Sequence, residues 1–379
     1  MNCFVCGTNN EPYSQLKFLS IDEAKPIKLD LHICQCGFAY YRHNEVEKLY
    51  NENSKYTTAN TGSGAPRQFD EKRLQNSFSN ISGYLNVDDT VLDVGCNNGT
   101  FLEILFENGC RKLTGTDFAI NRDYTAQLEK SGVKIHQTTS LKEISTDKFD
   151  FITANHVLEH VEDIKKFIGE LEYNLKDGGY LYIEVPDASR YNDLYFQPFS
   201  YFDLEHINHF SIDNLSFLLR EHGFEILESF SFAFDMNASI KYPGIGIVAR
   251  KNNNPSGVSA EIKVNTNNNI EEFYKRSLSE ISNYNYKGSF DNIVIYGVGA
   301  NTLRTLGMLD QSIENVCYFV DKNELFHERS ILNKKIKSIA HLLEDNTHPD
   351  ILIFSKLYYG EIVDDLRKKG IKNNIYSFF

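Results

Sequence analysis

The chain has 379 residues, of which 41% are hydrophobic and 24% are charged, and its formal net charge is −13. These values argue against a disordered or fibrous protein, and no apolar run approaches the ~18 residues that would span a bilayer. A balance of 39 Lys and Arg against 52 Asp and Glu argues against a nucleic-acid or anionic-membrane partner, because phosphate contacts need cations. The first thirty residues show no signal-peptide pattern, which predicts a cytoplasmic chain.

Four of the seven cysteines lie near the start of the chain, as a C-x2-C pair and a C-x-C pair: Cys3, Cys6, Cys34 and Cys36. A glycine follows each pair, a pattern typical of two tight turns whose thiolates surround one Zn²⁺. The alternatives are disulfides, which are disfavoured without a secretory signal, or free thiols. The sequence predicts a closed, structural zinc site in a module spanning residues 1–70, which ends in a polar loop or lid over 49–70. The remaining cysteines are expected to be small buried residues: Cys96, Cys110 and Cys317.

Residues 71–252 alternate helical and β-rich patterns. A helix is expected over about 71–84 from its apolar spacing, and from Thr90 onward strands and helices follow one another: VLDVG, FLEILFENG, KLTGTD, DYTAQLEKSG, FDFITAN, DIKKFIGELEYNL and GYLYIEVP. The alternation predicts an α/β fold with a doubly wound, Rossmann-like sheet. An Asn-rich linker over 251–269 then leads to a second Rossmann-like α/β domain within 253–379, whose expected strands are NIVIYGV, CYFVDKN and DILIFSK.

The strand–turn–helix run VLDVGCNNGT at 91–100 carries the strongest chemical signal. Gly95 and Gly99 let the backbone approach a ligand, and Asp117 at the next strand end can accept hydrogen bonds from both hydroxyls of a ribose. NAD and S-adenosylmethionine (SAM) both fit this pattern. The loop departs from G-x-G-x-x-G, and an aspartate can meet the amino group of a methionine, so SAM is favoured. The predicted cofactor-binding residues are Asp93, Gly95, Asn97, Asn98, Gly99, Asp117, Asn155 and His156.

These segments resemble known motifs. VLDVGCNNGT, TGTD and FDFITANHVLEHVED look like the successive motifs of class I SAM-dependent methyltransferases. GCNNG is similar to the G-x-N-D-G loop of the sugar C-methyltransferases of deoxysugar pathways. The four-cysteine module, LEHINHFS at 204–211 (E-H-x-x-Y-F-S in that family) and IYGVGAN at 295–301 (Y-G-A-x-A-K-G) extend the resemblance, in the same order, over nearly the whole chain.

The resemblance implies a small-molecule substrate, a nucleotide-linked 4-keto-deoxysugar that is methylated on the carbon beside its ketone. A base must remove that α-proton, and His206 is predicted to do so because an imidazole titrates near neutral pH. Glu205 is expected to orient His206 or to share the proton transfer. By resemblance, Tyr56 in the lid and His160 face the same cleft. The chain departs from the family at Asp203 and His209, where the family has tyrosines, and ordinary packing is the alternative role for each of these side chains.

Other functions fit parts of the pattern. An O- or N-methyltransferase of a sugar or another small metabolite would use the same cofactor loop. An RNA methyltransferase is disfavoured by the negative charge, and a binding protein with a decayed site is disfavoured by the intact strand-end aspartates. The C-terminal domain, with Asp321 ending its second strand, is expected to bind a nucleotide or to hold the substrate's diphosphate. The aromatic run at 191–202 is expected either to cover the sugar or nucleobase or to pack internally. No oligomeric state is predicted.

Overall fold

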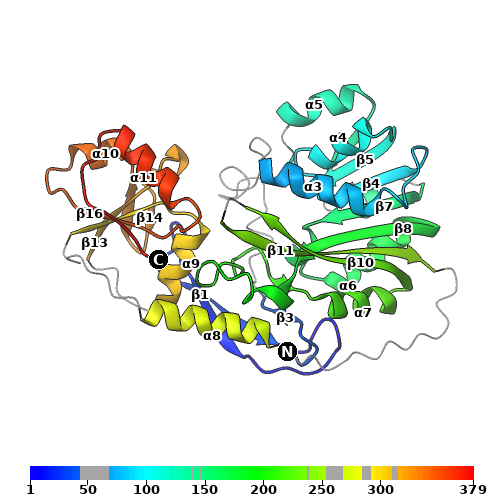
Figure 1. Ribbon diagram of the computed structural model, residues 1–379, viewed down its shortest axis with the longest axis horizontal. Coiled ribbons are helices and arrows are strands. Elements are labelled where there is room, and N and C mark those ends of the chain that lie inside the picture. The colour runs from blue at the N-terminus through cyan, green and yellow to red at the C-terminus, as the bar shows by residue number, and fades with distance from the viewer. Residues whose placement is uncertain are drawn as a thin grey trace. The chain divides into compact units, whose positions relative to one another are not determined.

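The computed structural model describes residues 1–42, 68–120, 122–138, 140–144, 147–236, 239–252, 268–283, 292–309 and 315–379 (Figure 1). The chain divides into two compact units, which are described separately. Unit 1 consists of Met1–Glu11, His32–Leu194 and Glu205–Asn269, and unit 2 of Pro12–Leu31, Tyr195–Leu204 and Ile270–Phe379. This division differs from the predicted boundaries after residues 70 and 252. Unit 2 also includes residues 12–31 and 195–204, which the prediction assigned to the two earlier domains. Most of the predicted lid and linker lies outside the described residues.

Unit 1 contains a seven-stranded sheet of order β10-β11-β8-β7-β4-β5-β6. Its strands are β4 (Thr90–Val94), β5 (Lys112–Asp117), β6 (Lys134–Gln137), β7 (Phe149–Asn155), β8 (Leu175–Pro186), β10 (Phe224–Asp235) and β11 (Lys241–Lys251). Its helices are α3 (Gln68–Ile81), α4 (Thr100–Glu107), α5 (Arg122–Lys130), α6 (Ile164–Asn174) and α7 (Ile212–Glu221), with short 3-10 turns η1 (Leu141–Glu143), η2 (Leu158–His160) and η3 (Ala188–Arg190). The sheet confirms the predicted doubly wound α/β architecture.

The strand order reverses at the centre of this sheet. Strands β6, β5, β4, β7 and β8 run parallel, and β11 is antiparallel to β8 and β10. The chain leaves β4 for β5 on one side, and later returns to β7 on the other. The carboxyl ends of β4 and β7 therefore form the switch point at which open α/β sheets bind ligands.

Two hydrophobic clusters cover the two faces of the sheet. Helices α3 and α4 lie on one face, and α6 and α7 lie on the other (Figure 1). The cluster on the face covered by α6 and α7 also includes apolar side chains from both cysteine-bearing segments: Cys3, Val5, Cys34, Cys36, Phe38 and Tyr40. This shared core explains why residues 1–11 and 32–42 belong to unit 1. Two short strands, β3 (Ala39–Tyr40) and β9 (Asn208–His209), pair antiparallel within it.

Unit 2 contains a second Rossmann-like sheet, of order β14-β15-β13-β12-β16-β17. Its strands are β12 (Ile293–Tyr296), β13 (Val316–Val320), β14 (Ser330–Ile331), β15 (Lys334–Lys337), β16 (Asp350–Ile353) and β17 (Ile375–Ser377). Its helices are α8 (Asn269–Ser282), α9 (Ala300–Leu309), α10 (Ile339–Glu344) and α11 (Tyr359–Lys368), with the 3-10 turn η4 (Glu324–Phe326). The parallel strands β12, β13 and β16 are the three that the sequence predicts.

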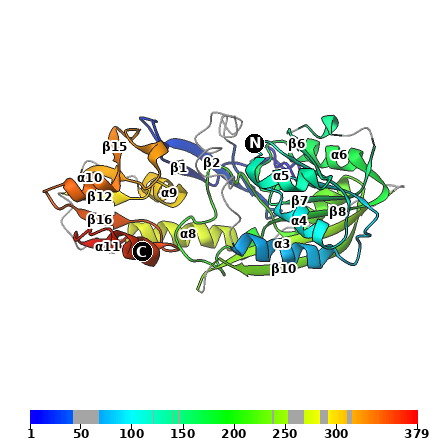
Figure 2. The ribbon, with the colours of Figure 1, turned by 90° about the horizontal axis from the view of Figure 1, so that it is seen from above.

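A hairpin from the beginning of the chain completes unit 2. Strands β1 (Ser14–Phe18) and β2 (Ile27–Ile33) pair antiparallel, and β1 lies beside α9 (Figure 2). The approach is close, because a Cβ added to Gly307 of α9 would lie 2.2 Å from the carbonyl oxygen of Lys17. Glycine is therefore required where the helix meets the strand.

The aromatic segment 195–204 also packs in unit 2. The ring of Phe273 on α8 lies 5.2 Å from that of Tyr201 and 5.5 Å from that of Phe202, measured between centroids. The backbone N–H of Phe199 donates to Ser277 Oγ at 2.9 Å. This part of the aromatic run therefore packs internally, which is one of the two roles expected for it. In the described parts of the chain, no helix combines the length and the apolar character needed to cross a membrane.

Candidate active site

Asp93 is the buried acid of the site. It ends β4 at the switch point, is 2% exposed, and accepts a hydrogen bond of 2.7 Å from the Thr153 hydroxyl on the neighbouring β7. Burial raises the pKa of Asp93 to about 7, although hydrogen bonding from Thr153 acts to lower it. A carboxyl group in this environment favours a cationic ligand, which would compensate its charge.

The loop after β4 is held by backbone geometry. Gly95 has φ +73° and Gly99 has φ +83°, and a Cβ at these positions would lie 2.4 Å from Val157 Cγ2 and 2.7 Å from Leu128 Cδ1 respectively. Both glycines are thus required by the left-handed backbone and by packing within the chain. The two glycines thus have a structural role in addition to the predicted one, which is to let the backbone approach a ligand.

Asp117 ends β5 and anchors the same loop. Its Oδ2 accepts a hydrogen bond of 2.9 Å from the N–H of Asn97, and its Oδ1 accepts one of 3.0 Å from the N–H of Ala119. Burial raises the pKa of this carboxyl. A carboxylate offers about four lone-pair sites, so Asp117 can hold the turn and still accept hydrogen bonds from a ribose.

Two asparagines near the switch point behave differently. Asn98 Oδ1 accepts hydrogen bonds from the N–H and the hydroxyl of Thr100, so this amide caps the start of α4. Asn155 is 8% exposed at the end of β7. In the part of the chain that the structure describes, its amide has no hydrogen bond of normal geometry, but it lies close enough to Asp93 to lower the pKa of that carboxyl. A buried amide of this kind indicates a ligand or water that completes the site.

His156 follows β7 with φ +55° and lies between two buried carboxylates. Its Nδ1 is 3.0 Å from Glu159 Oε1, and its Nε2 is 3.5 Å from Glu184 Oε1. Burial and Arg73 oppose its charged form, but the two glutamates prevail and raise the pKa of His156. The ring predicted to bind cofactor is therefore engaged by protein carboxylates.

Glu184 accepts hydrogen bonds from side chains on two elements, α3 and β8. On β8 it is fully buried, and Arg73 Nη1 and Ser77 Oγ of α3 each lie 2.7 Å from it, while Tyr182 donates at 2.8 Å. Burial acts to raise the pKa of Glu184, but hydrogen bonding from His156, the charge of Arg73 and the Ser77 hydroxyl lower it to about 2. Sequence analysis missed Glu184, although a glutamate inside the apolar run LYIEVP is a detectable anomaly.

Three predicted catalytic residues come together beside this network. The rings of His160 and His206 are 4.7 Å apart and roughly perpendicular. His160 Nδ1 lies 3.1 Å from the carbonyl oxygen of Glu205, so an N–H there leaves Nε2 as an acceptor. Glu159, His160 and His206 each place a ligand-type atom within 4.8 Å of the others. Tyr56, the fourth predicted catalytic residue, lies outside the described residues.

Asn208 fixes the segment that carries His206. Its amide donates to the carbonyl oxygens of Leu158 and Val161 at 3.2 and 2.7 Å, and its strand β9 pairs with β3. The two histidines thus meet because β9 is held against the η2 turn. The sequence carried no local signal for this role, since the pairing joins segments about 170 residues apart.

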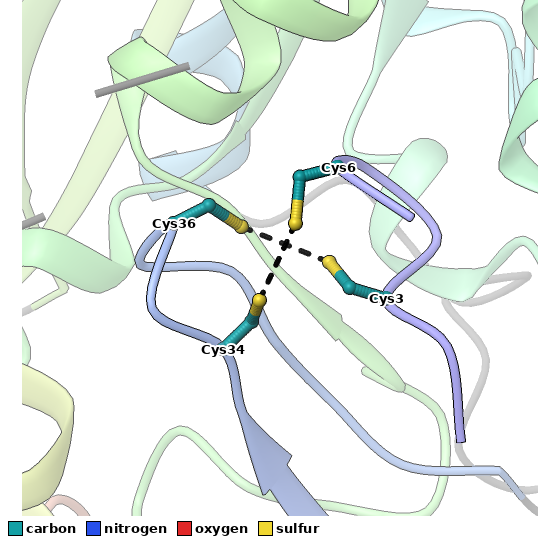
Figure 3. Close-up of side chains that lie close together, drawn as sticks. All are labelled: Cys3, Cys6, Cys34 and Cys36. Atoms are coloured by element: carbon teal, nitrogen blue, oxygen red, sulfur yellow. Dashed lines mark hydrogen bonds between the residues drawn. The ribbon is translucent and has the colours of Figure 1, made fainter. Parts of the chain in front are cut away.

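The four early cysteines converge on one point (Figure 3). Cys3 Sγ lies 3.7 Å from Cys36 Sγ, Cys6 Sγ lies 3.4 Å from Cys34 Sγ, and all four sulfurs are within 4.8 Å of one another. These distances exclude disulfides, whose sulfurs are about 2.05 Å apart. A tetrahedron with Zn–S bonds of about 2.3 Å has S–S edges of about 3.8 Å, which matches the cluster.

Turn geometry and charge also suit a cation at this point. Gly7 (φ +74°) and Gly37 (φ +79°) close the two turns, and their N–H groups donate to the carbonyls of Cys3 and Cys34. Hydrogen bonding with Cys34 raises the pKa of Cys3 to about 12, and that from Cys3 lowers the pKa of Cys34 to about 2. The cluster by itself therefore favours a single thiolate, and a divalent cation would allow four.

The other cysteines follow the expectation in part. Cys96 and Cys110 are buried as expected. Cys317 is exposed, and its thiol lies 3.1 Å from Asn292 Oδ1, so the expectation of burial was wrong there. In β13 the side chain at this position alternates outward, with Val316 and Tyr318 directed inward.

Comparison with protein families assigns the central region. Residues 67–229 match the family model described as a methyltransferase domain, and residues 289–375 match a model described as C2185-like, N-terminal. Residues 67–229 are therefore similar to a methyltransferase domain, and most of them lie in the Rossmann-like part of unit 1. The first match contains every predicted cofactor-binding residue and the histidine pair.

Proteins that match part of this chain include two O-methyltransferases and a solved N-methyltransferase. A ubiquinone biosynthesis O-methyltransferase of Rickettsia conorii is 28% identical over 186 residues, which cover 46% of this chain and 63% of that protein. The protein of the same name from a Chelativorans species is 34% identical over 98 residues, 24% of this chain and 38% of that protein. The crystal structure of Burkholderia thailandensis 1,6-didemethyltoxoflavin-N1-methyltransferase, with bound 1,6-didemethyltoxoflavin and S-adenosylhomocysteine (SAH), is 20% identical with a TM-score of 0.39, covering 48% of this chain and 80% of that one.

Proposed function

We propose that this chain is a SAM-dependent methyltransferase that methylates the carbon beside the ketone of a nucleotide-linked 4-keto-deoxysugar. The observation that carries the proposal is the convergence of Asp93, Asp117 and Asn155 on the carboxyl ends of three adjacent parallel strands in a methyltransferase domain. In η2, which follows β7, His160 meets His206 with ring centroids 4.7 Å apart, and both groups are able to move a proton.

The donor set suits SAM. The buried carboxyl of Asp93 would gain from the cationic amino group of the methionine moiety, and Asp117 has lone pairs left for two ribose hydroxyls. The buried side-chain amide of Asn155, at the end of β7, can donate and accept hydrogen bonds between them. When bound, SAM supplies an electrophilic methyl group on a sulfonium.

The acceptor carbon must become nucleophilic before it can take that methyl group. In the proposed reaction His206 accepts the α-proton, leaving an enolate, and the site holds the enolate carbon in line with the methyl–sulfur bond. The new C–C bond forms as the C–S bond breaks, and the proton passes from His206 to solvent. Glu205 would orient His206 or share the proton transfer, and His160, whose ring lies 4.7 Å from that of His206, would face the sugar's oxygens.

A direct test uses labelled SAM with TDP-, CDP- and GDP-4-keto sugars and locates the methyl group by NMR. A new C–CH3 group is expected. An O–CH3 product, or no turnover with any keto sugar, would contradict the proposal. Exchange of the α-proton with deuterium in the absence of SAM tests the base alone: His206→Asn should exchange at least tenfold more slowly than the parent protein.

Methyl transfer to oxygen is the second candidate. It is favoured by the curated relatives, which are named ubiquinone biosynthesis O-methyltransferases, although the chain covers only 38–63% of their length. Here the histidine pair would deprotonate a hydroxyl. The same NMR experiment separates the two, since the methyl carbon of an ether resonates far from that of a C–CH3 group.

We also propose that the cysteine cluster holds a structural Zn²⁺. The sulfur distances support a tetrahedral ion, and four protein ligands leave no open position for catalysis. Metal analysis of freshly purified protein is expected to give about one equivalent of zinc, and less than about half an equivalent would count against the site.

A further inference from the structure

A chain of alternating charges runs through the interior of unit 1. It begins at Arg73 on α3 and passes through Glu184 on β8 and His156 after β7 to Glu159 in η2. The successive contacts are 2.7, 3.5 and 3.0 Å. Both glutamate side chains are fully buried, and those of Arg73 and His156 are 12% and 18% exposed. The chain contains two positive and two negative groups, which satisfies the requirement that buried charges be compensated.

Glu159, the last member, adjoins the histidine pair. It precedes His160 in the sequence, and its carboxylate lies within 4.8 Å of ring nitrogens of His160 and His206. Its own ion-pair partner is His156, the preceding member of the charge chain. The carboxylate therefore acts on both histidines through space.

We propose that Glu159 is a positioning residue whose buried negative charge sets the protonation of His160 and His206, and that His156, Glu184 and Arg73 keep that charge in place. The inference rests on the proposed function only in assigning proton transfer to the two histidines. Its physical basis is that a carboxylate in a poorly solvated site stabilises a proton on a neighbouring imidazole.

The remainder of the charge chain explains how Glu159 stays ionised. A carboxyl group buried alone takes up a proton at neutral pH. Burial acts in that direction here, but His156 and the two histidines lower the pKa of Glu159 to about 2. Glu184 and Arg73 in turn hold His156. Further charged groups around the histidine pair are Glu205 in the same segment and Arg42, which donates to Asn208 Oδ1, with Glu162 and Asp163 beyond it.

Opposite changes at two members give the proposal a distinctive signature. Glu159→Gln removes the negative charge, so the NMR titration midpoints of His160 and His206 should move to lower pH by about one unit. His156→Gln removes the compensating cation, so the same midpoints should move to higher pH. Arg73→Gln, at the partly exposed end, should move them upward by less. The resonances are assigned with His160→Gln and His206→Gln.

Matched controls separate this effect from general disruption. Glu107→Gln changes an exposed glutamate on α4 and should leave both midpoints unchanged, as should Glu159→Asp, which keeps the charge. His222, whose ring bonds to the Leu218 carbonyl elsewhere in unit 1, serves as an internal reference in every variant.

The outcomes are decisive without a known acceptor. Unchanged midpoints in Glu159→Gln, or shifts of the same sign in Glu159→Gln and His156→Gln, would overturn the proposal. So would a second equivalent of divalent metal that Glu159→Gln loses, because Glu159 would then be a ligand. If the shifts occur as expected but no keto sugar is methylated, the positioning role stands and the proposed substrate is wrong. With an active acceptor, Glu159→Gln should move the acid limb of the pH–rate profile to lower pH and reduce kcat about tenfold.

Discussion

Asp93 illustrates how a single residue can favour binding at the expense of folding. It is nearly completely buried, and a single side-chain hydroxyl donates a hydrogen bond to it. Its pKa of about 7 in the folded protein lies above the value of about 4 of an unfolded chain. Ionisation therefore disfavours the folded state, and stability without ligand falls as pH rises from about 4 through 7.

Asp93→Asn should separate these two effects. The amide keeps an acceptor for Thr153 but carries no charge, so at pH 8 the ligand-free variant should be more stable than the parent by about 1–3 kcal/mol. SAH affinity should fall at least tenfold. Urea unfolding at pH 4 and pH 8, with calorimetric SAH titration, measures both. A variant that is less stable than the parent at pH 8 would contradict this account.

Helix α3 is attached to the sheet at the level of individual hydrogen bonds. Arg73 and Ser77 donate to Glu184, and Asn80 donates to the Tyr182 hydroxyl at 3.2 Å. These residues lie three or four positions apart and share one face of the helix. The element is thus fixed by polar contacts as well as by Leu74 and Ile81.

Ser77→Ala should cost about 1.5–3 kcal/mol of unfolding free energy, because it removes a hydrogen bond to a buried carboxylate. Ser79→Ala is the matched control on the same helix. Its hydroxyl bonds only to the Gln75 carbonyl on the exposed face, and its loss should cost less than about 0.5 kcal/mol. Chemical denaturation of the two variants compares them, and equal costs would show that Ser77 has no special role.

Strands were predictable from the sequence where they are long and apolar. They were not predictable where they are short or depend on segments far away in the sequence. The sequence identified β4, β5, β7 and β8 because their buried runs alternate with helical patterns. It missed β6, whose run KIHQ contains a single buried residue, and the two-residue strands β3 and β9, which pair with each other, β3 pairing also with β2. The hairpin β1–β2 was hidden within the predicted zinc module, since its partner α9 is nearly 300 residues away.

The candidate site was predictable to the same extent. Strand-end aspartates and glycines follow from local rules, so Asp93, Gly95, Gly99 and Asp117 could be named without coordinates. The roles of Glu159, Glu184 and Asn208 depend on which strands become neighbours, and a single sequence does not encode that visibly. His156 was predicted to bind cofactor, and the contacts of its ring with two glutamates could not be read from the sequence.

At the scale of the whole molecule, the cysteine cluster is connected to the histidine pair through β3 and β9. Cys34 and Cys36 lie just before β3, and β9 follows His206 after a single residue. Loss of the proposed zinc should loosen this pairing and displace His206, while the cofactor loop is built on separate strands.

Cys34→Ser is therefore expected to lower the metal content and reduce kcat at least tenfold, with SAH affinity within about twofold of the parent. The control is Cys317→Ser, which changes an exposed thiol and should alter none of the three. Metal analysis, methyl-transfer rates and calorimetry provide the measurements. A parallel loss of SAH affinity in Cys34→Ser would argue against separate roles for the two regions.

The division of the chain predicts the result of a truncation. A fragment ending at residue 252 would retain hairpin 12–31 and segment 195–204 without the rest of unit 2, exposing Phe199, Tyr201 and Phe202, which are fully buried in the intact chain. The fragment should aggregate or bind a hydrophobic dye. The same fragment with these three residues changed to Ser should be more soluble, and equal aggregation of both fragments would refute the explanation.

The position of the β1–β2 hairpin has a consequence during synthesis. The hairpin leaves the ribosome early, but α9, the helix that covers β1, follows nearly 300 residues later. At translation rates of about 5–20 residues per second, the hairpin waits on the order of 15–60 s for its partner. During that interval the nascent chain exposes the apolar side of the hairpin that α9 later covers. A chaperone that binds the chain early and leaves late would therefore suit this protein better than one that acts only after release.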